Sequence, residues 1–228
     1  MNLKLIAVCG MLLTSGFAWS AEKAALKTDK EKLSYSIGAS IGKNLKAEKT
    51  DVDLNLLIKG LKSSLAGENI LLSEQEIRQV MGDYQRELRQ RAMLGRQQAA
   101  GENRKKGDAY LAEYKTQKGV SALPSGILYK VVKEGDGKKP SESDTVEVNY
   151  RGALISGKEF DATKPGEPAN LKVASLIAGW KQALSVMPAG SKWQIVIPSE
   201  LAYGERGVGG DIGPNEVLVF DVELLAIK

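Results

Sequence analysis

Histidine is absent from the 228 residues, and cysteine occurs once, at Cys9. Imidazole is the commonest general base and metal ligand at neutral pH, so its absence excludes serine–histidine and cysteine–histidine nucleophiles and histidine-bound zinc. We expect no metal and no other cofactor. Blocks of like charge are lacking too, because the 32 basic and 28 acidic residues are interspersed. This mixed surface argues against nucleic-acid binding, whereas the 43% hydrophobic content supports a buried core.

No apolar run is long enough to span a bilayer. The longest, residues 5–13, follows Lys4 and precedes small residues at Ala18 and Ser20. This order is typical of a secretory signal peptide, here residues 1–20. A buried N-terminal helix is the alternative, but the charged residues that follow disfavour it. We therefore expect export and no membrane span.

Cys9 lies inside this leader, which raises the question of a lipid anchor. Val8 is larger than the small residue expected before a lipidated cysteine, and few residues precede it. Cleavage of the leader would leave a mature chain that has no thiol and forms no disulfide.

The first half of the mature chain is predicted to be helical, because residues 29–118 contain good helix formers and almost no strand signal. A helix near residues 29–45 and a second near 53–65 each carry an apolar stripe. Such stripes need a partner, which we expect to be a third helix and a second copy of the chain. This assigns residues 21–72 to an all-α dimerisation domain. The stripes consist of Leu33, Ile37, Ile41 and Leu45, and of Leu54, Leu57, Ile58, Leu61 and Leu65.

The longest predicted helix begins at Ser73, which has the capping-box spacing to Glu76. No proline interrupts the chain as far as Lys115. A continuous helix would therefore extend about 64 Å, at roughly 1.5 Å per residue. Its segment 95–108 is nearly all polar and contains three glycines. Two interpretations stay open: the second half of the helix is an exposed stalk that the glycines leave bendable, or residues 95–107 are a disordered linker. We assign residues 73–118 to a long connecting helix.

The second half, residues 119–228, is predicted to be an α+β domain. Proline, glycine and β-branched residues become frequent from Gly119 onward. One amphipathic helix, residues 174–187, ends at Pro188 and would cover one face of an antiparallel sheet. The segments that alternate as strands do are residues 127–132, 145–154, 192–197 and 217–227.

Four separated segments, VEVNYRGALISGKEFDAT, LIAGWKQAL, ELAYGERG and LVFDVELL, resemble in order and spacing those of FKBP-type peptidyl-prolyl cis/trans isomerases. The resemblance covers residues 125–228. With its leader and helical half, the chain is similar to the macrophage infectivity potentiator group of periplasmic FKBP isomerases. The resemblance implies a V-shaped homodimer joined through residues 21–118, located in the periplasm or associated with the outer membrane.

The resemblance also implies the site. Phe160, Asp161 and Tyr203 would be catalytic, with the Tyr203 hydroxyl and the backbone N–H of Ile177 donating to substrate carbonyls. Asp161 would either orient Tyr150 or act electrostatically on the carbonyl carbon, and both roles stay open. The substrate-binding walls would be Tyr150, Leu171, Leu176, Ile177, Trp180, Val208, Ile212 and Phe220, with Trp180 as the floor.

The chemistry of amide rotation suits a chain without histidine. Resonance imposes a barrier of roughly 18–20 kcal/mol, and a catalyst has only to favour the twisted amide over the planar one. An apolar cavity with a few fixed donors would do this. Departures from the family pattern at Leu171, Ser175, Val208 and Asp211 should alter the preferred residue before proline and the affinity for macrolides of the FK506 and rapamycin type.

We therefore expect a peptidyl-prolyl isomerase that acts on proline-containing, exported polypeptides. Two alternatives use the same pocket without catalysis. One is a holdase whose helical half binds unfolded chains, and the other is a virulence-associated binding protein.

Overall fold

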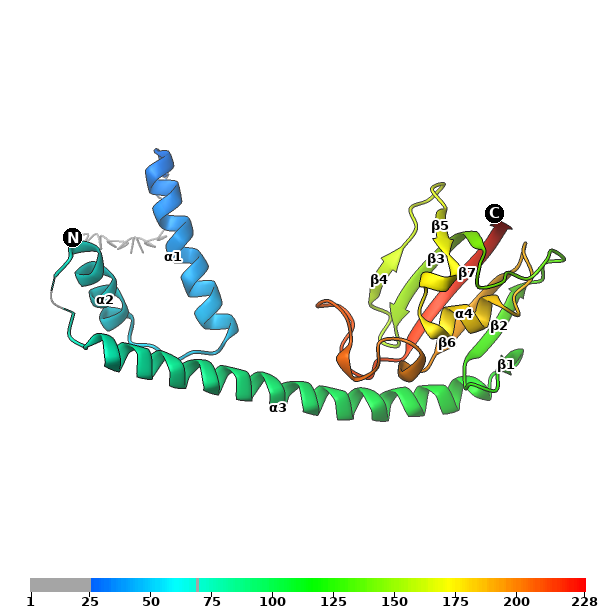
Figure 1. Cartoon of the computed structure of the whole chain (residues 1–228), viewed down its shortest axis with the longest axis horizontal. Helices are drawn as coiled ribbons and strands as arrows, with labels where there is room; N and C mark the ends of the chain where they lie inside the picture. The colour runs from blue at the N-terminus through cyan, green and yellow to red at the C-terminus, as the bar shows by residue number, and fades with distance from the viewer. Residues whose placement is uncertain (1–25, 69) are drawn as a thin grey trace, which may run out of the picture. The chain divides into compact units, whose positions relative to one another are not determined.

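The computed structural model describes residues 26–68 and 70–228. The chain divides between Ser73 and Glu74 into two compact units, which we describe one at a time (Figure 1). The predicted leader, its cleavage site and Cys9 lie outside the described residues. Within those residues, no helix combines the length and the apolar character that a membrane crossing requires.

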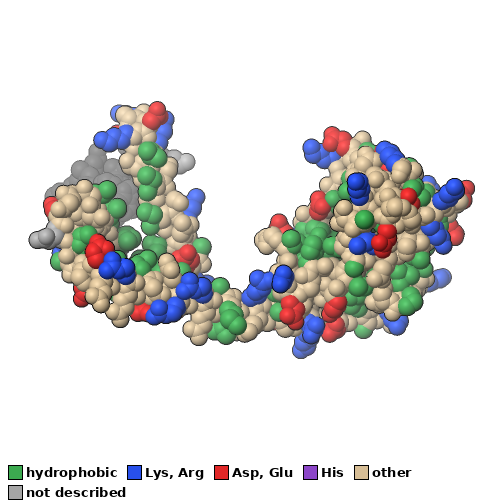
Figure 2. All heavy atoms as spheres, viewed as in Figure 1, with side chains coloured by type: hydrophobic (Ala, Val, Ile, Leu, Met, Phe, Trp, Pro, Cys, Tyr) green, Lys and Arg blue, Asp and Glu red, His purple; other side chains and the backbone are tan. Residues whose placement is uncertain are grey.

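The described part of the first unit contains two helices, α1 (Asp29–Ala47) and α2 (Leu54–Ala66), close to the predicted bounds. Thr28 caps α1 in a capping box with Glu31, and the Asp53 side chain caps α2. Gly67 ends α2 in the left-handed conformation that glycine adopts most easily. Neither helix has a buried residue, and both apolar stripes are exposed in this unit except at the half-buried Leu45; Figure 2 shows apolar side chains on its surface.

The second unit begins with α3 (Glu74–Lys115), a continuous helix of 42 residues. At roughly 1.5 Å per residue, this helix is about 63 Å long. The disordered-linker interpretation of residues 95–107 is therefore wrong. The exposed-stalk interpretation is wrong for the end of that segment, because Gly107 is buried against Val217. The polar side chains there make specific contacts with the rest of the unit, which sequence polarity alone does not reveal.

One antiparallel sheet forms the centre of the second unit, in the order β1-β2-β6-β7-β3-β4, with β5 also paired to β3. The four predicted strands are present, and three short ones, β1, β4 and β5, were not predicted. The strands are β1 (Val120–Ala122), β2 (Leu128–Lys133), β3 (Thr145–Leu154), β4 (Glu159–Ala162), β5 (Ala169–Lys172), β6 (Lys192–Ile197) and β7 (Leu218–Ile227).

Helix α4 (Ala178–Leu184) is shorter than the predicted helix 174–187. Residues 173–175 form a 3-10 turn instead, and Leu176 and Ile177 adopt extended backbone conformations. These two residues therefore follow the apolar spacing of a helix without belonging to one.

Both faces of the sheet are covered, because successive side chains of a strand point to opposite faces. On one face, Trp180 and Leu184 of α4 pack with Ile195 and Phe220 in the main core. On the other face, α3 contributes Tyr110, Leu111 and Tyr114 to a second cluster, which contains Leu128, Val196 and Val217 of the sheet region. The C-terminal part of α3 is thus a structural layer of this unit (Figure 1).

Candidate active site

A cavity of about 290 Å³ opens beside α4 on the main-core face of the sheet. Nine of the eleven predicted site residues line it, together with Ser175. The other two do not: Ile212 is buried in the core and Val208 is exposed in the neighbouring loop. The lining residues are Tyr150, Phe160, Asp161, Leu171, Ser175, Leu176, Ile177, Trp180, Tyr203 and Phe220.

Aromatic rings in edge-to-face contact build the walls of this cavity. The Trp180 ring, on α4, meets Tyr150 of β3 at a centroid distance of 5.5 Å and Phe220 of β7 at 5.3 Å. Phe220 in turn meets Phe160 of β4 at 5.6 Å. Edge-to-face pairs place a positive ring edge on a negative ring face, so each ring fixes the orientation of the next. The cavity is therefore held in shape by four elements at once.

Gly152 of β3 is a site residue that the sequence reasoning did not single out. A Cβ at this position would lie 2.7 Å from Phe220 and 2.8 Å from Phe160, closer than real Cβ contacts. Only glycine lets these two rings meet above the strand. A glycine inside an alternating strand is the signal that could have revealed it, since such glycines often mark close approach.

Asp161 accepts a hydrogen bond of 2.6 Å from the Tyr150 hydroxyl. The two residues come together because β4 pairs with β3 in a register that places Asp161 opposite Gly152. Burial, and then the hydrogen bond to this carboxylate, raise the pKa of Tyr150 to about 12. This hydrogen bond is the contact that the first of the two roles left open for Asp161, the orientation of Tyr150, requires.

Tyr203 reaches the cavity from the loop between β6 and β7, and its side chain is 36% exposed. Ile177 stands at the N-cap of α4, where the residue's own N–H takes no part in the helical hydrogen bonds. The cavity thus combines apolar walls with hydrogen-bond donors at its edge. This combination can bind an apolar ring and orient a carbonyl, and it contains no group arranged for covalent attack.

The loop that follows Tyr203 is closed by a β-bridge between Val208 and Ile212, with backbone N–H to O distances of 3.0 and 3.3 Å. Asp211, at its tip, forms an ion pair of 2.7 Å with Lys158 in the turn after β3. The Asp211 carboxylate therefore has a cationic partner beside the cavity and does not line its wall.

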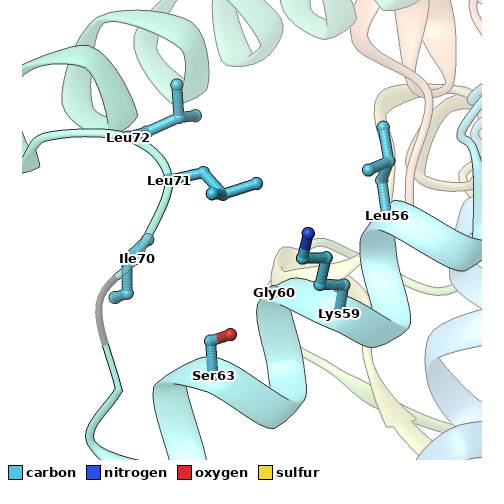
Figure 3. A pocket seen from close by; sticks show the side chains of 7 residues that line it. All are labelled: Leu56, Lys59, Gly60, Ser63, Ile70, Leu71 and Leu72. Carbon is cyan, nitrogen blue, oxygen red and sulfur yellow. The ribbon is translucent and has the colours of Figure 1, made fainter.

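A separate apolar cavity of about 320 Å³ lies in the first unit, between α2 and the segment that follows it (Figure 3). Among the described residues that line it, Lys59 and Ser63 carry the polar side-chain groups and the rest is apolar, so the cavity can bind apolar material. It is lined by Leu56, Lys59, Gly60, Ser63, Ile70, Leu71 and Leu72.

Comparison with known proteins matches two family models in succession. Residues 30–131 match the domain amino-terminal to FKBP-type peptidyl-prolyl isomerase, and residues 136–225 match FKBP-type peptidyl-prolyl cis-trans isomerase. The outer membrane protein MIP of Legionella longbeachae is 43% identical over 100% of this chain and 99% of its own length.

The chain belongs to the FKBP-type peptidyl-prolyl isomerase family.

Two further comparisons support this membership. The peptidyl-prolyl cis-trans isomerase Mip of Coxiella burnetii is 39% identical over 89% of each chain. The crystal structure of FkpA from Escherichia coli, 40% identical, superposes with a TM-score of 0.69 and covers 90% of this chain and 99% of its own. The protein is therefore an FKBP-type isomerase with an α+β catalytic domain preceded by helices, as the sequence predicted.

Proposed function

We propose that this FKBP isomerase accelerates X-Pro rotation by binding the twisted amide in the cavity beside α4. The proline ring would lie against Trp180, within walls that exclude water. The Tyr203 hydroxyl and the Ile177 N–H would each donate to a substrate carbonyl. The aromatic-walled cavity carries this proposal, because a twisted amide has a less polar carbonyl and gains from leaving water.

Asp161 would act in this mechanism through Tyr150. By accepting the Tyr150 hydroxyl at 2.6 Å, it fixes the ring that meets Trp180 edge-on. A carboxylate held by this bond shapes the cavity without entering the reaction. Macrolides of the FK506 and rapamycin type would occupy the same space, with an affinity set by Leu171 and Ser175 at the rim.

The substrates would be proline-containing segments of exported proteins in the periplasm. The secretory pattern of residues 1–20 supports this location, and one relative is named an outer membrane protein. Residues 21–72 would form the dimerisation domain and 73–118 the connecting helix before the isomerase domain 119–228. The exposed apolar stripes of α1 and α2 support a homodimer formed through residues 21–118.

A holdase activity is the second candidate, and the apolar cavity of the first unit favours it (Figure 3). Apolar segments of unfolded chains would fit a cavity whose lining is almost wholly aliphatic. This role would coexist with catalysis, because the two cavities lie in different units.

The deciding experiment is NMR exchange of a short X-Pro peptide with the full-length protein. We expect the protein to accelerate cis/trans exchange of the peptide. In Tyr203→Phe the acceleration should fall about 3- to 10-fold, because one hydrogen bond that strengthens in the transition state is lost. Asp161→Asn keeps the shape of the side chain and should lower the rate to a similar extent. No acceleration by the unmodified protein would leave only the two non-catalytic alternatives, the holdase and the virulence-associated binding protein.

A further inference from the structure

The loop that carries Tyr203 is bonded to α3 by two reciprocal side-chain contacts. The Asn103 side-chain amide donates to the Pro214 carbonyl at 2.9 Å, and the Asn215 side-chain amide donates to the Ala100 carbonyl at 3.3 Å. Each asparagine thus bonds the backbone of the other's segment. We call this pair of contacts the asparagine clasp.

Burial, backbone conformation and a backbone hydrogen bond fix Asn215 in this position. Its exposed fraction is 6%, and its φ is 56°. This is the left-handed conformation, which asparagine tolerates better than most residues. Its own backbone N–H donates to the Gly204 carbonyl at 2.9 Å. Gly204 follows Tyr203 directly in the chain. A continuous path of contacts therefore leads from α3 to the backbone beside Tyr203, through Asn103, Pro214, Asn215 and Gly204.

Two further contacts hold the same loop against α3. The Arg96 guanidinium donates to the carbonyls of Glu205 and Arg206, the first at 3.3 Å. Arg104 pairs with Glu200 at 3.4 Å. Both contacts are exposed and therefore individually weak, so the partly buried clasp is the stronger connection.

We propose that Asn103 and Asn215 are positioning residues that hold Tyr203 at the cavity through Gly204, so that α3 is a functional part of the isomerase site. Tyr203 is 36% exposed and reaches the cavity from a loop with little regular structure, so its backbone needs an external support. The clasp supplies it from the helix. The proposal rests on the role of Tyr203 as a carbonyl donor.

The variant that tests the clasp is Asn103→Asp in the full-length protein. It keeps the side-chain shape but replaces the amide donor with an acceptor facing the Pro214 carbonyl. We expect kcat/KM for the X-Pro peptide to fall about 3- to 10-fold, mainly in kcat, because a mispositioned hydroxyl loses a contact that strengthens in the transition state. Lys105→Ala, at an exposed neighbouring position on α3, is the matched control and should leave kcat/KM unchanged.

A double-mutant cycle separates positioning from general destabilisation. In a Tyr203→Phe background, Asn103→Asp should lower kcat/KM less than about twofold further, because the hydroxyl it positions is already gone. If the two losses multiply in full, Asn103 does not act through Tyr203 and the proposal is overturned.

Amide hydrogen exchange provides a readout that does not depend on the role of Tyr203. Asn103→Asp should accelerate exchange at the Asn215 N–H, which bonds Gly204, and leave the β3 and β7 amides unchanged. Unchanged exchange at Asn215 would refute the clasp. Faster exchange together with full activity in Tyr203→Phe would keep the clasp as a structural contact, but would overturn both the catalytic role of Tyr203 and the positioning function.

Discussion

Gly152 has no side chain, and the rings of Phe160 and Phe220 occupy the space that one would need. Gly152→Ala should therefore lower the free energy of unfolding by about 1–3 kcal/mol, as overpacking in a tight core does. Peptide isomerisation should fall as well, because the displaced rings form the cavity wall. Urea unfolding and the NMR exchange assay measure the two effects.

Gly210→Ala is the control for this substitution, since a Cβ there would meet nothing within 4 Å. It should leave both stability and activity close to those of the unmodified protein. An equally tolerated Gly152→Ala would show that the aromatic rings can shift at little cost.

The Tyr150 hydroxyl should lose its proton at a higher pH than an ordinary tyrosine does. Burial and the Asp161 hydrogen bond disfavour its phenolate and raise its pKa from 10.0 to about 12. A raised folded-state pKa means that Tyr150 contributes stability below its ordinary pKa, and that this contribution is lost as the pH rises from 10.0 toward about 12. The difference in phenolate absorbance between the unmodified protein and Tyr150→Phe should therefore appear near pH 12.

Asp161→Asn tests one cause of the raised Tyr150 pKa, the hydrogen bond to the carboxylate, separately from burial. It removes the carboxylate but leaves the burial, so the Tyr150 pKa should fall part of the way toward 10.0. A Tyr150 titration that Asp161→Asn leaves unchanged would contradict the proposed role of the carboxylate.

At the scale of elements, the glycines of α3 differ in their surroundings. A Cβ at Gly101 would meet nothing within 4 Å, whereas one at Gly107 would lie 2.7 Å from Val217. Gly101→Ala should stabilise the second unit by about 1 kcal/mol through helix propensity, and Gly107→Ala should destabilise it by a similar or larger amount. Thermal unfolding of the full-length variants measures both. Equal shifts would mean that α3 is not seated on the sheet as described.

Helices and strands whose apolar residues recur at a regular spacing over many residues could be predicted from the sequence, and shorter elements could not. The four longer strands of the sheet have six to ten residues, and β7 alternates clearly between buried and less buried positions, whereas β1, β4 and β5 have only three or four residues in which to show a period. Helix α4 was overestimated because Leu176 and Ile177 have helical spacing but serve as the cavity wall.

The candidate site also has one part that the sequence predicts and one part that it does not. Its aromatic residues could be located because a family pattern identifies them together. The asparagine clasp could not, because Asn103 in a polar segment has the same sequence signal as a solvated side chain. Only the tertiary contact with Pro214 distinguishes the two.

At the scale of the whole molecule, the first unit has apolar side chains that its own fold does not cover. Leu33 is 62% exposed and Leu65 is 81% exposed. Leu33→Glu with Leu65→Glu should weaken self-association about a hundredfold or more, because charge replaces apolar contacts at the proposed interface. Sedimentation velocity measures this, and the peptide isomerase activity should remain.

Lys62→Glu, an exposed charge change on α2, is the control and should leave association intact. A dimer that survives Leu33→Glu with Leu65→Glu would place the interface outside these two stripes. Loss of the dimer in Lys62→Glu would instead indicate a general sensitivity to charge.

The described residues contain two tryptophans, and they occupy different surroundings. Trp180 lines the cavity beside α4, whereas Trp193 stacks on Tyr129 at a centroid distance of 4.4 Å. An occupant of the cavity displaces water from beside one indole and leaves the other untouched. In the expected mature chain, which would lack Trp19, the emission of Trp180 would follow occupancy while that of Trp193 would serve as an internal reference.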